Sequence, residues 1–236
     1  MSKGFTLVEL AIVLVIIGLL VSGILIAQSI IDSTRIQRFV REFEQYESAV
    51  DHFEQRYRDL PGDTDLFPVS VRGSAVADDD IIGDNLNTYV WFTSEVAHFW
   101  KHLSQANILD ETYSEDATSG MRAGEHMPEI VYEGVGLFPH SFVTAGKLVF
   151  FVYDFSATTN ASYGATYLPS FTPATLYAID LKLDDGVAMS ALNAASVDRV
   201  SSADATGNCW RVTGVYPKEY NVTEEDKVCI AYMRAR

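Results

Sequence analysis

Basic residues are scarce in this sequence. Lysine and arginine total 17, aspartate and glutamate total 32, and the formal net charge is −15. Lys3 is the only base and Glu9 the only acid before Asp32, so the whole imbalance lies from Asp32 onward. A surface of this sign repels phosphate backbones. We therefore expect no nucleic-acid partner and a self-repelling, soluble exterior.

Catalytic signatures are also absent. The sequence has no G-x-S-x-G, no H-E-x-x-H and no P-loop. It has five histidines and many carboxylates, but no spacing among them selects an acid–base pair. The sequence therefore gives no reason to expect an enzyme.

Cysteine is limited to Cys209 and Cys229. An apolar N-terminal run followed by a polar chain indicates export, where disulfides persist. We predict a disulfide, which would stabilise the fold by about 3 kcal/mol in the chain-entropy model. The alternative is two unrelated buried thiols. Residues 208–212 and 227–232 could be two strands that this bond ties together, with antiparallel pairing.

Proline is missing between Phe5 and Leu60. Leu10 to Ala27 contains no charge, and with its flanks it reaches the roughly 20 residues that cross a membrane. A carboxylate such as Glu9 in this setting costs roughly 2.5–3.5 kcal/mol and is usually functional. A plain signal peptide is the alternative, although its basic region would be only Met-Ser-Lys and no clear cleavage site ends the run.

A regular apolar stripe follows the apolar run. Its members recur at spacings of three and four, as on one face of a helix: Ile36, Phe39, Val40, Phe43, Tyr46, Val50, Phe53 and Tyr57. Pro61-Gly62 then ends the pattern. We predict one helix of about 55 residues, apolar on every side in its first half and amphipathic in its second.

Residues 59–93 are typical of a loop region, because they are rich in turn formers. Four carboxylates stand close together there and are candidate calcium ligands: Asp78, Asp79, Asp80 and Asp84. The EF-hand spacing is absent, so a solvated acidic turn is the alternative. Calcium is the only cofactor that the sequence suggests.

Residues 94–107 predict a helix, with Ser94 as N-cap and Asn107 as the C-terminal stop. His98 and His102 are four apart and could chelate zinc. No third ligand is evident, so we interpret them as exposed histidines on an amphipathic helix.

Strand signals come later in the chain, whereas residues 108–146 show little pattern. Residues 147–153 and 174–183 are rich in β-branched and aromatic residues, and the second run stops at Asp184-Asp185-Gly186, a tight-turn signal. Asp180, Asp184 and Asp185 fit turn and edge-strand positions better than metal ligation. The fold class that we predict is α+β, with a long N-terminal helix packed on an antiparallel sheet.

The segment from Gly4 to Leu10, GFTLVEL, resembles the prepilin cleavage motif of type IV pilins and type II secretion pseudopilins. The resemblance implies that a prepilin peptidase cuts between Gly4 and Phe5 and that the new Phe5 amine is methylated. It also implies an assembly role for Glu9. A neighbouring subunit's amine can pair with the Glu9 carboxylate only in the assembled register, which makes the position selective. The alternative is that Glu9 only snorkels to the headgroups.

A second resemblance lies in the phrases LPGD, W-K-H-L and IDLKLDDG, which are similar to a group of bacterial prepilin-like proteins. It implies one continuous pilin-type domain. The expected divisions are a leader (1–4), a hydrophobic filament-core helix (5–31), the amphipathic half of the helix (32–60) and a globular head (61–236). This chain departs from the group at Asn107 and in the acidic loop at 78–85.

The resemblance implies a structural subunit that polymerises into a filament of many copies. A type IV pilus subunit for adhesion, motility or uptake and a type II secretion pseudopilin are both possible, and the length of the chain favours the pilus. The implied partners are further copies, a prepilin peptidase, an assembly platform and the bacterial inner membrane before assembly. The final location would be the cell surface, or the periplasm for a pseudopilin. A membrane-anchored binding module or enzyme is the remaining alternative.

Overall fold

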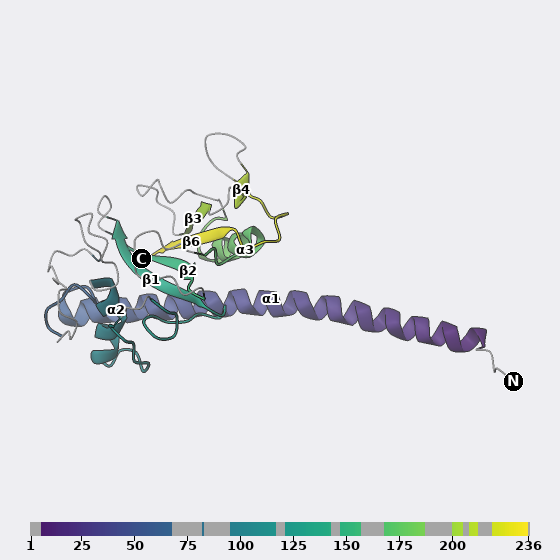
Figure 1. The fold of residues 1–236 in the computed structure, drawn as a ribbon, viewed down its shortest axis with the longest axis horizontal. Coiled ribbons are helices and arrows are strands. Elements are labelled where there is room, and N and C mark those ends of the chain that lie inside the picture. Colours follow the sequence, from purple (N-terminus) through teal and green to yellow (C-terminus); the bar gives the residue numbers. More distant parts are fainter. Residues whose placement is uncertain are drawn as a thin grey trace. The chain divides into compact units, whose positions relative to one another are not determined.

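The computed structural model describes residues 6–67, 82, 95–116, 121–142, 147–156, 168–186, 200–204, 208–211 and 219–235. The chain divides into two compact units, residues 1–38 and residues 39–236. Helix α1, Leu7–Tyr57, begins in the first unit and ends in the second (Figure 1). The long N-terminal helix predicted from the missing prolines is therefore confirmed.

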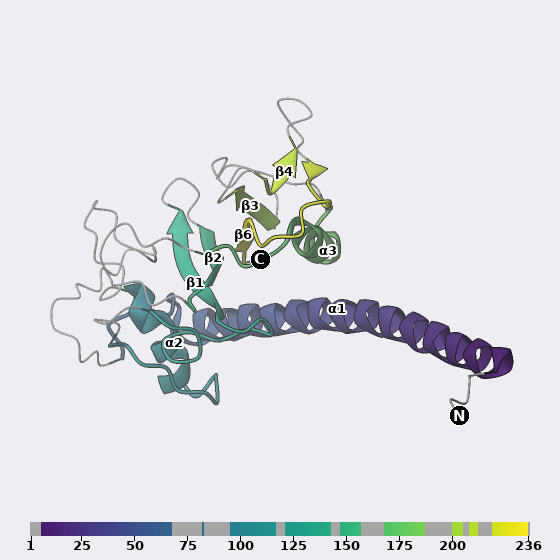
Figure 2. The same ribbon diagram turned by 45° about the vertical axis from the view of Figure 1, so that its right-hand side comes forward.

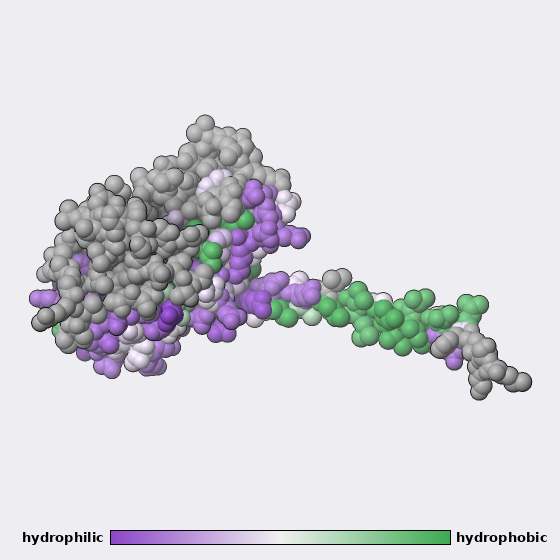
Figure 3. Space-filling model, in the orientation of Figure 1, coloured by the Kyte–Doolittle hydropathy of each residue, from purple (hydrophilic) through white to green (hydrophobic). Residues whose placement is uncertain are grey.

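The first unit contains the apolar part of α1. Its described large apolar side chains between Leu7 and Ile31 are between 50% and 87% exposed. Figure 3 shows this stretch as a nearly continuous hydrophobic surface. No residue described in this unit is buried, so the helix here presents apolar side chains on every side, as the sequence predicted.

The second unit is built on a four-stranded antiparallel sheet of order β1–β2–β6–β3 (Figures 1 and 2). Its strands are β1 (Val135–Phe142), β2 (Lys147–Asp154), β6 (Cys229–Arg234) and β3 (Val200–Asp204). Two short strands, β4 (Trp210–Arg211) and β5 (Glu219–Tyr220), pair separately. A helix and an antiparallel sheet make the fold α+β, which confirms the predicted class and is consistent with the pilin fold.

The amphipathic part of α1 contributes the centre of the core of this unit. Phe39, Phe43 and Phe53 are fully buried. Phe43 meets Phe150 of β2 edge to face at 5.9 Å between ring centroids. Phe39 meets Phe171 in the same way at 5.7 Å. Edge-to-face pairs of this kind add to the hydrophobic gain from burial. The apolar stripe predicted from the spacing is therefore packed in the core, with Phe43 against strand β2.

Helix α1 ends three residues before the predicted Leu60. Arg58 adopts a positive φ of 63°, and its N–H donates to Glu54 O at 2.8 Å. Gly62 then requires glycine, because its φ is 99° and a Cβ would come within 2.5 Å of Glu95 O. The helix therefore ends just before Arg58, whose backbone is in the left-handed conformation, and Pro61-Gly62 forms the turn that follows.

Helix α2, Glu95–Gln105, is terminated by Asn107, as the sequence predicted. Asn107 has a φ of 55°. Ile108 N–H donates to Leu103 O at 3.1 Å and Asn107 N–H to Ser104 O at 3.0 Å. These two bonds make a Schellman motif with Asn107 at the left-handed position. The proposed N-cap, Ser94, lies outside the described residues.

The interpretation of His98 and His102 as exposed was wrong, since both side chains are fully buried. His102 accepts a hydrogen bond from Gly62 N–H through Nδ1 at 3.0 Å. Burial, together with nearby His98, lowers the pKa of His102 to about 4. His102 therefore stays neutral near pH 7 and ties the Pro61-Gly62 turn to α2. The apolar residues of α2 predicted one buried face, but the face that carries His98 and His102 is buried as well.

The prediction of a strand over 174–183 was also wrong, because Pro173–Leu183 is helix α3. Thr172 is its N-cap, and its hydroxyl accepts from Thr175 N–H at 3.2 Å. Pro173 follows at the first helical position, where its missing N–H costs nothing. Leu176, Ile179 and Leu183 are buried, which is the spacing of one helical face. Thr172-Pro173 is a helix-start signal in the sequence, but the strand propensity of the residues after it outweighed this signal in the prediction.

The predicted disulfide joins Cys209 and Cys229, whose Cα atoms are 5.1 Å apart. Contrary to expectation, β4, which follows Cys209, does not pair with β6, which begins at Cys229. Trp210, next to Cys209, pairs with Tyr220 of β5, whereas Cys229 pairs with Asp204 of β3. The bond therefore connects the small sheet to the large one. Strand β1 was missed altogether, within residues judged to have little pattern.

Candidate functional site at the start of helix α1

Glu9 is bound to its own helix N-terminus. Thr6 N–H and Thr6 Oγ1 both donate to Glu9 Oε2, each at 2.8 Å, and Glu9 N–H donates to Thr6 Oγ1 at 3.2 Å. This reciprocal arrangement is a capping box, in which the N-cap and the third helical residue satisfy each other's backbone donors. The carboxylate also lies at the positive end of the helix dipole. Glu9 therefore has a local partner in the single subunit.

The capping box leaves one carboxylate oxygen for another partner. Both Thr6 donors bind Oε2, and among the described residues no hydrogen bond reaches Oε1. Glu9 is exposed in the single chain. A cation from outside the subunit can thus approach Oε1 while Oε2 keeps its bonds to Thr6.

Thr6 is the residue of this candidate site that sequence reasoning missed. The signal was present as Thr6-Leu7-Val8-Glu9, the spacing of a capping box ahead of an apolar run. The two predicted processing residues, Gly4 and Phe5, lie outside the described residues.

The helix that carries Glu9 has the length and composition of a membrane span. Within the described part of the chain, α1 is the one helix long and apolar enough to cross a membrane. The 22 residues from Leu10 to Ile31 lack charge and span about 33 Å at 1.5 Å per residue. A hydrocarbon core is about 30 Å thick. Glu9 and Asp32 therefore bracket a segment that matches this thickness.

The predicted calcium ligands, Asp78, Asp79, Asp80 and Asp84, lie outside the described residues. Among the residues that are described, no group of three or more histidine, cysteine, aspartate or glutamate side chains could hold a metal ion. His98 lies 3.7 Å from the carboxylate of Glu115, as an ion pair if it is protonated.

Asp180 has a structural position in the second unit. It is fully buried in α3, where the predicted edge-strand role does not apply, and accepts a hydrogen bond from Tyr220 Oη at 3.0 Å. Burial raises the pKa of Asp180 to about 7, and nearby Asp184 and Asp185 add to this, although the Tyr220 and Gly186 hydrogen bonds oppose it. The IDLKLDDG phrase thus forms the end of α3 and the turn after it, with Asp184 as C-cap.

Comparison with known proteins decides what the N-terminal segment is. Residues 1–25 match the family described as the prokaryotic N-terminal methylation motif. The chain carries a prepilin leader. This leader is the one found in type IV pilins and pseudopilins. No curated protein and no solved structure matches the chain. The prepilin leader therefore supports a pilin or pseudopilin family protein through its first 25 residues, and the rest of the chain is interpreted from its own structure.

Proposed function

We propose that this prepilin is a structural subunit of a bacterial type IV pilus, not an enzyme. The observation that carries the proposal is the capped Glu9 at the start of a helix that is apolar on every side. Many copies would bury residues 5–31 against one another, with the acidic heads facing outward. Van der Waals packing and the Glu9 pair must drive this step, since the membrane is already an apolar solvent.

The proposed assembly step uses the two oxygens of Glu9 separately. A peptidase cut between Gly4 and Phe5 creates a positive amine at the helix start. In the filament, the Phe5 amine of an incoming subunit would bind Oε1 of Glu9 in a neighbour, while Oε2 stays on Thr6. Each charge would otherwise be left unpaired in apolar surroundings, at several kcal/mol, so only the correct register satisfies both.

A type II secretion pseudopilin is the second candidate, because the same leader and helix serve both. Fibres on the cell surface that vanish when the gene is deleted would support the pilus. Loss of protein secretion without surface fibres would support the pseudopilin. Either role requires processing by a prepilin peptidase, insertion into the inner membrane and recruitment by an assembly platform.

Two substitutions separate the charge of Glu9 from its cap. Glu9→Gln keeps a capping-box side chain but removes the negative charge, since glutamine also serves at this position. We expect it to be cleaved and inserted normally, and to lower fibre yield at least tenfold. Thr6→Val keeps the Glu9 charge and the side-chain shape but removes the hydroxyl. We expect a smaller loss of fibres, which Thr6→Ser restores.

The measurements are leader cleavage and N-methyl-Phe5 by mass spectrometry, and sheared fibres by electron microscopy. The host strain should lack the wild-type gene. Normal fibre yield from Glu9→Gln would refute the charge pairing. Purified native fibres that lack this chain beginning at N-methyl-Phe5 would refute the subunit role itself.

A further inference from the structure

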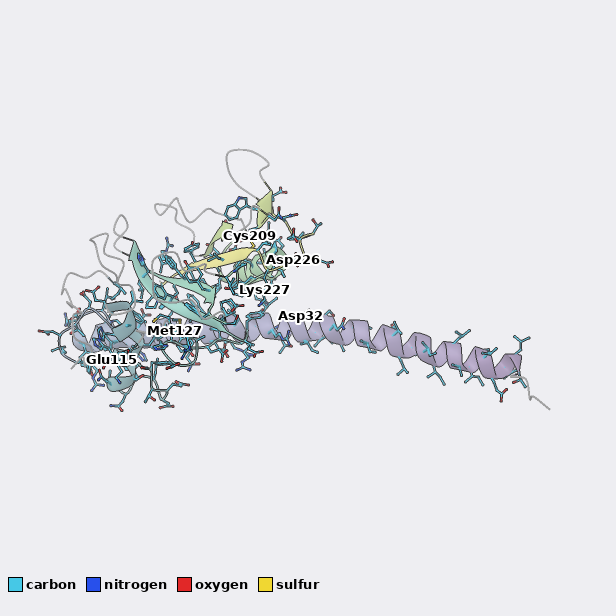
Figure 4. The ribbon with its side chains drawn as sticks, viewed as in Figure 1. Asp32, Glu115, Met127, Cys209, Asp226 and Lys227 are labelled. Carbon is cyan, nitrogen blue, oxygen red and sulfur yellow. A yellow bond between two sulfur atoms is a disulfide. The ribbon has the colours of Figure 1, made fainter. Side chains whose placement is uncertain are left out.

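Two arginines lie just beyond the uncharged part of α1, in a chain that is otherwise short of bases. Arg35 and Arg38 follow Asp32 at spacings of three and are exposed. The Arg35 side chain is 57% exposed and Asp32 is 71% exposed, and the two form a loose ion pair at 3.9 Å. Figure 4 marks Asp32, where this charged stretch begins. An exposed pair of this kind contributes little energy, so the Arg35 guanidinium remains available to a stronger partner.

The position of these arginines along the helix matches the headgroup layer of a membrane. If the segment from Leu10 to Ile31 fills the hydrocarbon, Arg35 and Arg38 lie about 5 and 9 Å beyond Asp32 along the axis. The headgroup region extends roughly 5–7 Å past the hydrocarbon on each side. Arginine side chains also bend toward the interface near helix ends. Both guanidinium groups can therefore reach the phosphates of one leaflet.

We propose that Arg35 and Arg38 bind the phosphate groups of anionic phospholipids in the leaflet on the Asp32 side of the membrane before the subunit joins a filament. The proposal rests on the membrane-inserted stage of the proposed function. A guanidinium is a planar donor that binds phosphate oxygens in a bidentate way. The two arginines are three positions apart and so share one side of the helix.

The position of the two arginines favours a lipid phosphate as their first partner, because an unassembled subunit meets headgroups at this level before it meets another copy. A chain with net charge −15 is repelled by an anionic membrane surface. Arg35 and Arg38 supply the local attraction at the one place where the chain enters that surface. They thereby set the depth of α1 and place Glu9 at the opposite interface, about 33 Å away across the uncharged segment.

The test uses the full chain in phosphatidylcholine vesicles, with spin-labelled phosphatidylglycerol as the probe and spin-labelled phosphatidylcholine as the reference. We expect the wild type to restrict phosphatidylglycerol preferentially, by about fivefold for each arginine, and to lose the preference in high salt. The double variant Arg35→Gln, Arg38→Gln should show no preference. The control is Arg56→Gln, Arg122→Gln, which removes the same charge from residues 39–236 and should retain it.

Three results would overturn the proposal. The first is equal restriction of both lipids by the wild type. The second is an undiminished lipid preference in the Arg35, Arg38 variant. If that variant also forms no fibres, the arginines contact another copy and not a lipid. The third is loss of the preference in about 10 mM inorganic phosphate at constant ionic strength, which indicates a site for free phosphate. The lipid measurement is made on unassembled chain, so absence of fibres tests the proposed function separately.

Discussion

The two parts of helix α1 have the same backbone conformation but opposite environments. Among the described residues before Phe39 none is buried, whereas Phe39, Phe43, Ala49, Val50 and Phe53 are buried in the second unit. The second part is stabilised within one chain by packing against its own sheet. The described apolar side chains of the first part are exposed, so this surface needs an apolar partner, lipid or protein. One helix thus contributes to the core of the second unit through one part and presents an apolar surface through the other.

The largest expected effect is the difference in stability loss between removing a large side chain from the second part and removing one from the first. Phe43→Ala should lower the free energy of unfolding of the second unit by about 3–5 kcal/mol, because Phe43 is fully buried against Phe150. Leu14→Ala should change it by less than about 0.5 kcal/mol, because Leu14 is 68% exposed. Denaturant unfolding of the full chain in detergent, followed by tryptophan fluorescence, gives both values. Similar losses in the two variants would contradict the division of roles.

The disulfide should matter for the second unit alone. Replacing Cys209 and Cys229 together by alanine should destabilise this unit by about 3 kcal/mol, because the bond closes a loop across 20 positions and links two sheets. The far-ultraviolet helical signal that persists in detergent after the second unit unfolds should be unchanged. A loss of this residual signal in the double variant would show that the first part of α1 depends on the second unit.

Sequence periodicity predicted α1 and its buried stripe well, because a long regular repeat outweighs local propensity. Local patterns did less well for short elements. In α3, Tyr177 and Ile179 have strand propensity and led to the wrong prediction of a strand. The Thr172-Pro173 start and the burial of Leu176 and Leu183 on one face favour the helix instead. In β1, Pro139 and Gly136 weaken the strand signal, and pairing with β2 supplies what propensity lacks.

The candidate site was predicted in part. Glu9 stands out because a carboxylate in an apolar run is costly. Its local partner Thr6 could have been found from the capping-box spacing. The pairing of Asp180 with Tyr220, 40 positions away, could not, because only the folded chain brings them together.

Two glycines sharpen the comparison within the first part of α1. A Cβ at Gly18 or Gly23 would meet no atom within 4 Å, so alanine fits at both positions. The double variant Gly18→Ala, Gly23→Ala should stabilise the helix by about 1 kcal/mol at each site. Hydrogen exchange of the full chain in detergent should slow across residues 18–24, with the unfolding midpoint of the second unit unchanged. If assembly requires this stretch to unwind, fibre yield falls in the same variant. Unchanged exchange would mean that the glycines do not limit the helix.

The smallest effect in the wild type is a pH dependence confined to the second unit, because two buried groups there act in opposite directions. The pKa of folded Asp180 is raised to about 7 from an ordinary value of 3.8, so the folded state holds a proton that the unfolded chain has released between these values. This contribution to stability is complete below about pH 4, declines as the pH rises, and is lost above about pH 7, by at most about 1.4 kcal/mol per pH unit. His102, with its pKa lowered to about 4, acts in the opposite direction between pH 4 and 6.5. The wild type alone therefore cannot separate the two groups.

Asp180→Asn isolates the aspartate, because asparagine keeps an acceptor for Tyr220 but does not ionise. Relative to wild type, the variant should gain stability steadily as the pH rises from 4 to 7, with a constant difference above that range. Unfolding midpoints of the full chain at several pH values give the difference curve, and His102 cancels from it because both proteins retain that residue. A flat curve would mean that Asp180 is ionised in the folded protein throughout this range. The residual helical signal from the first part of α1 should show no such dependence, since neither group lies there.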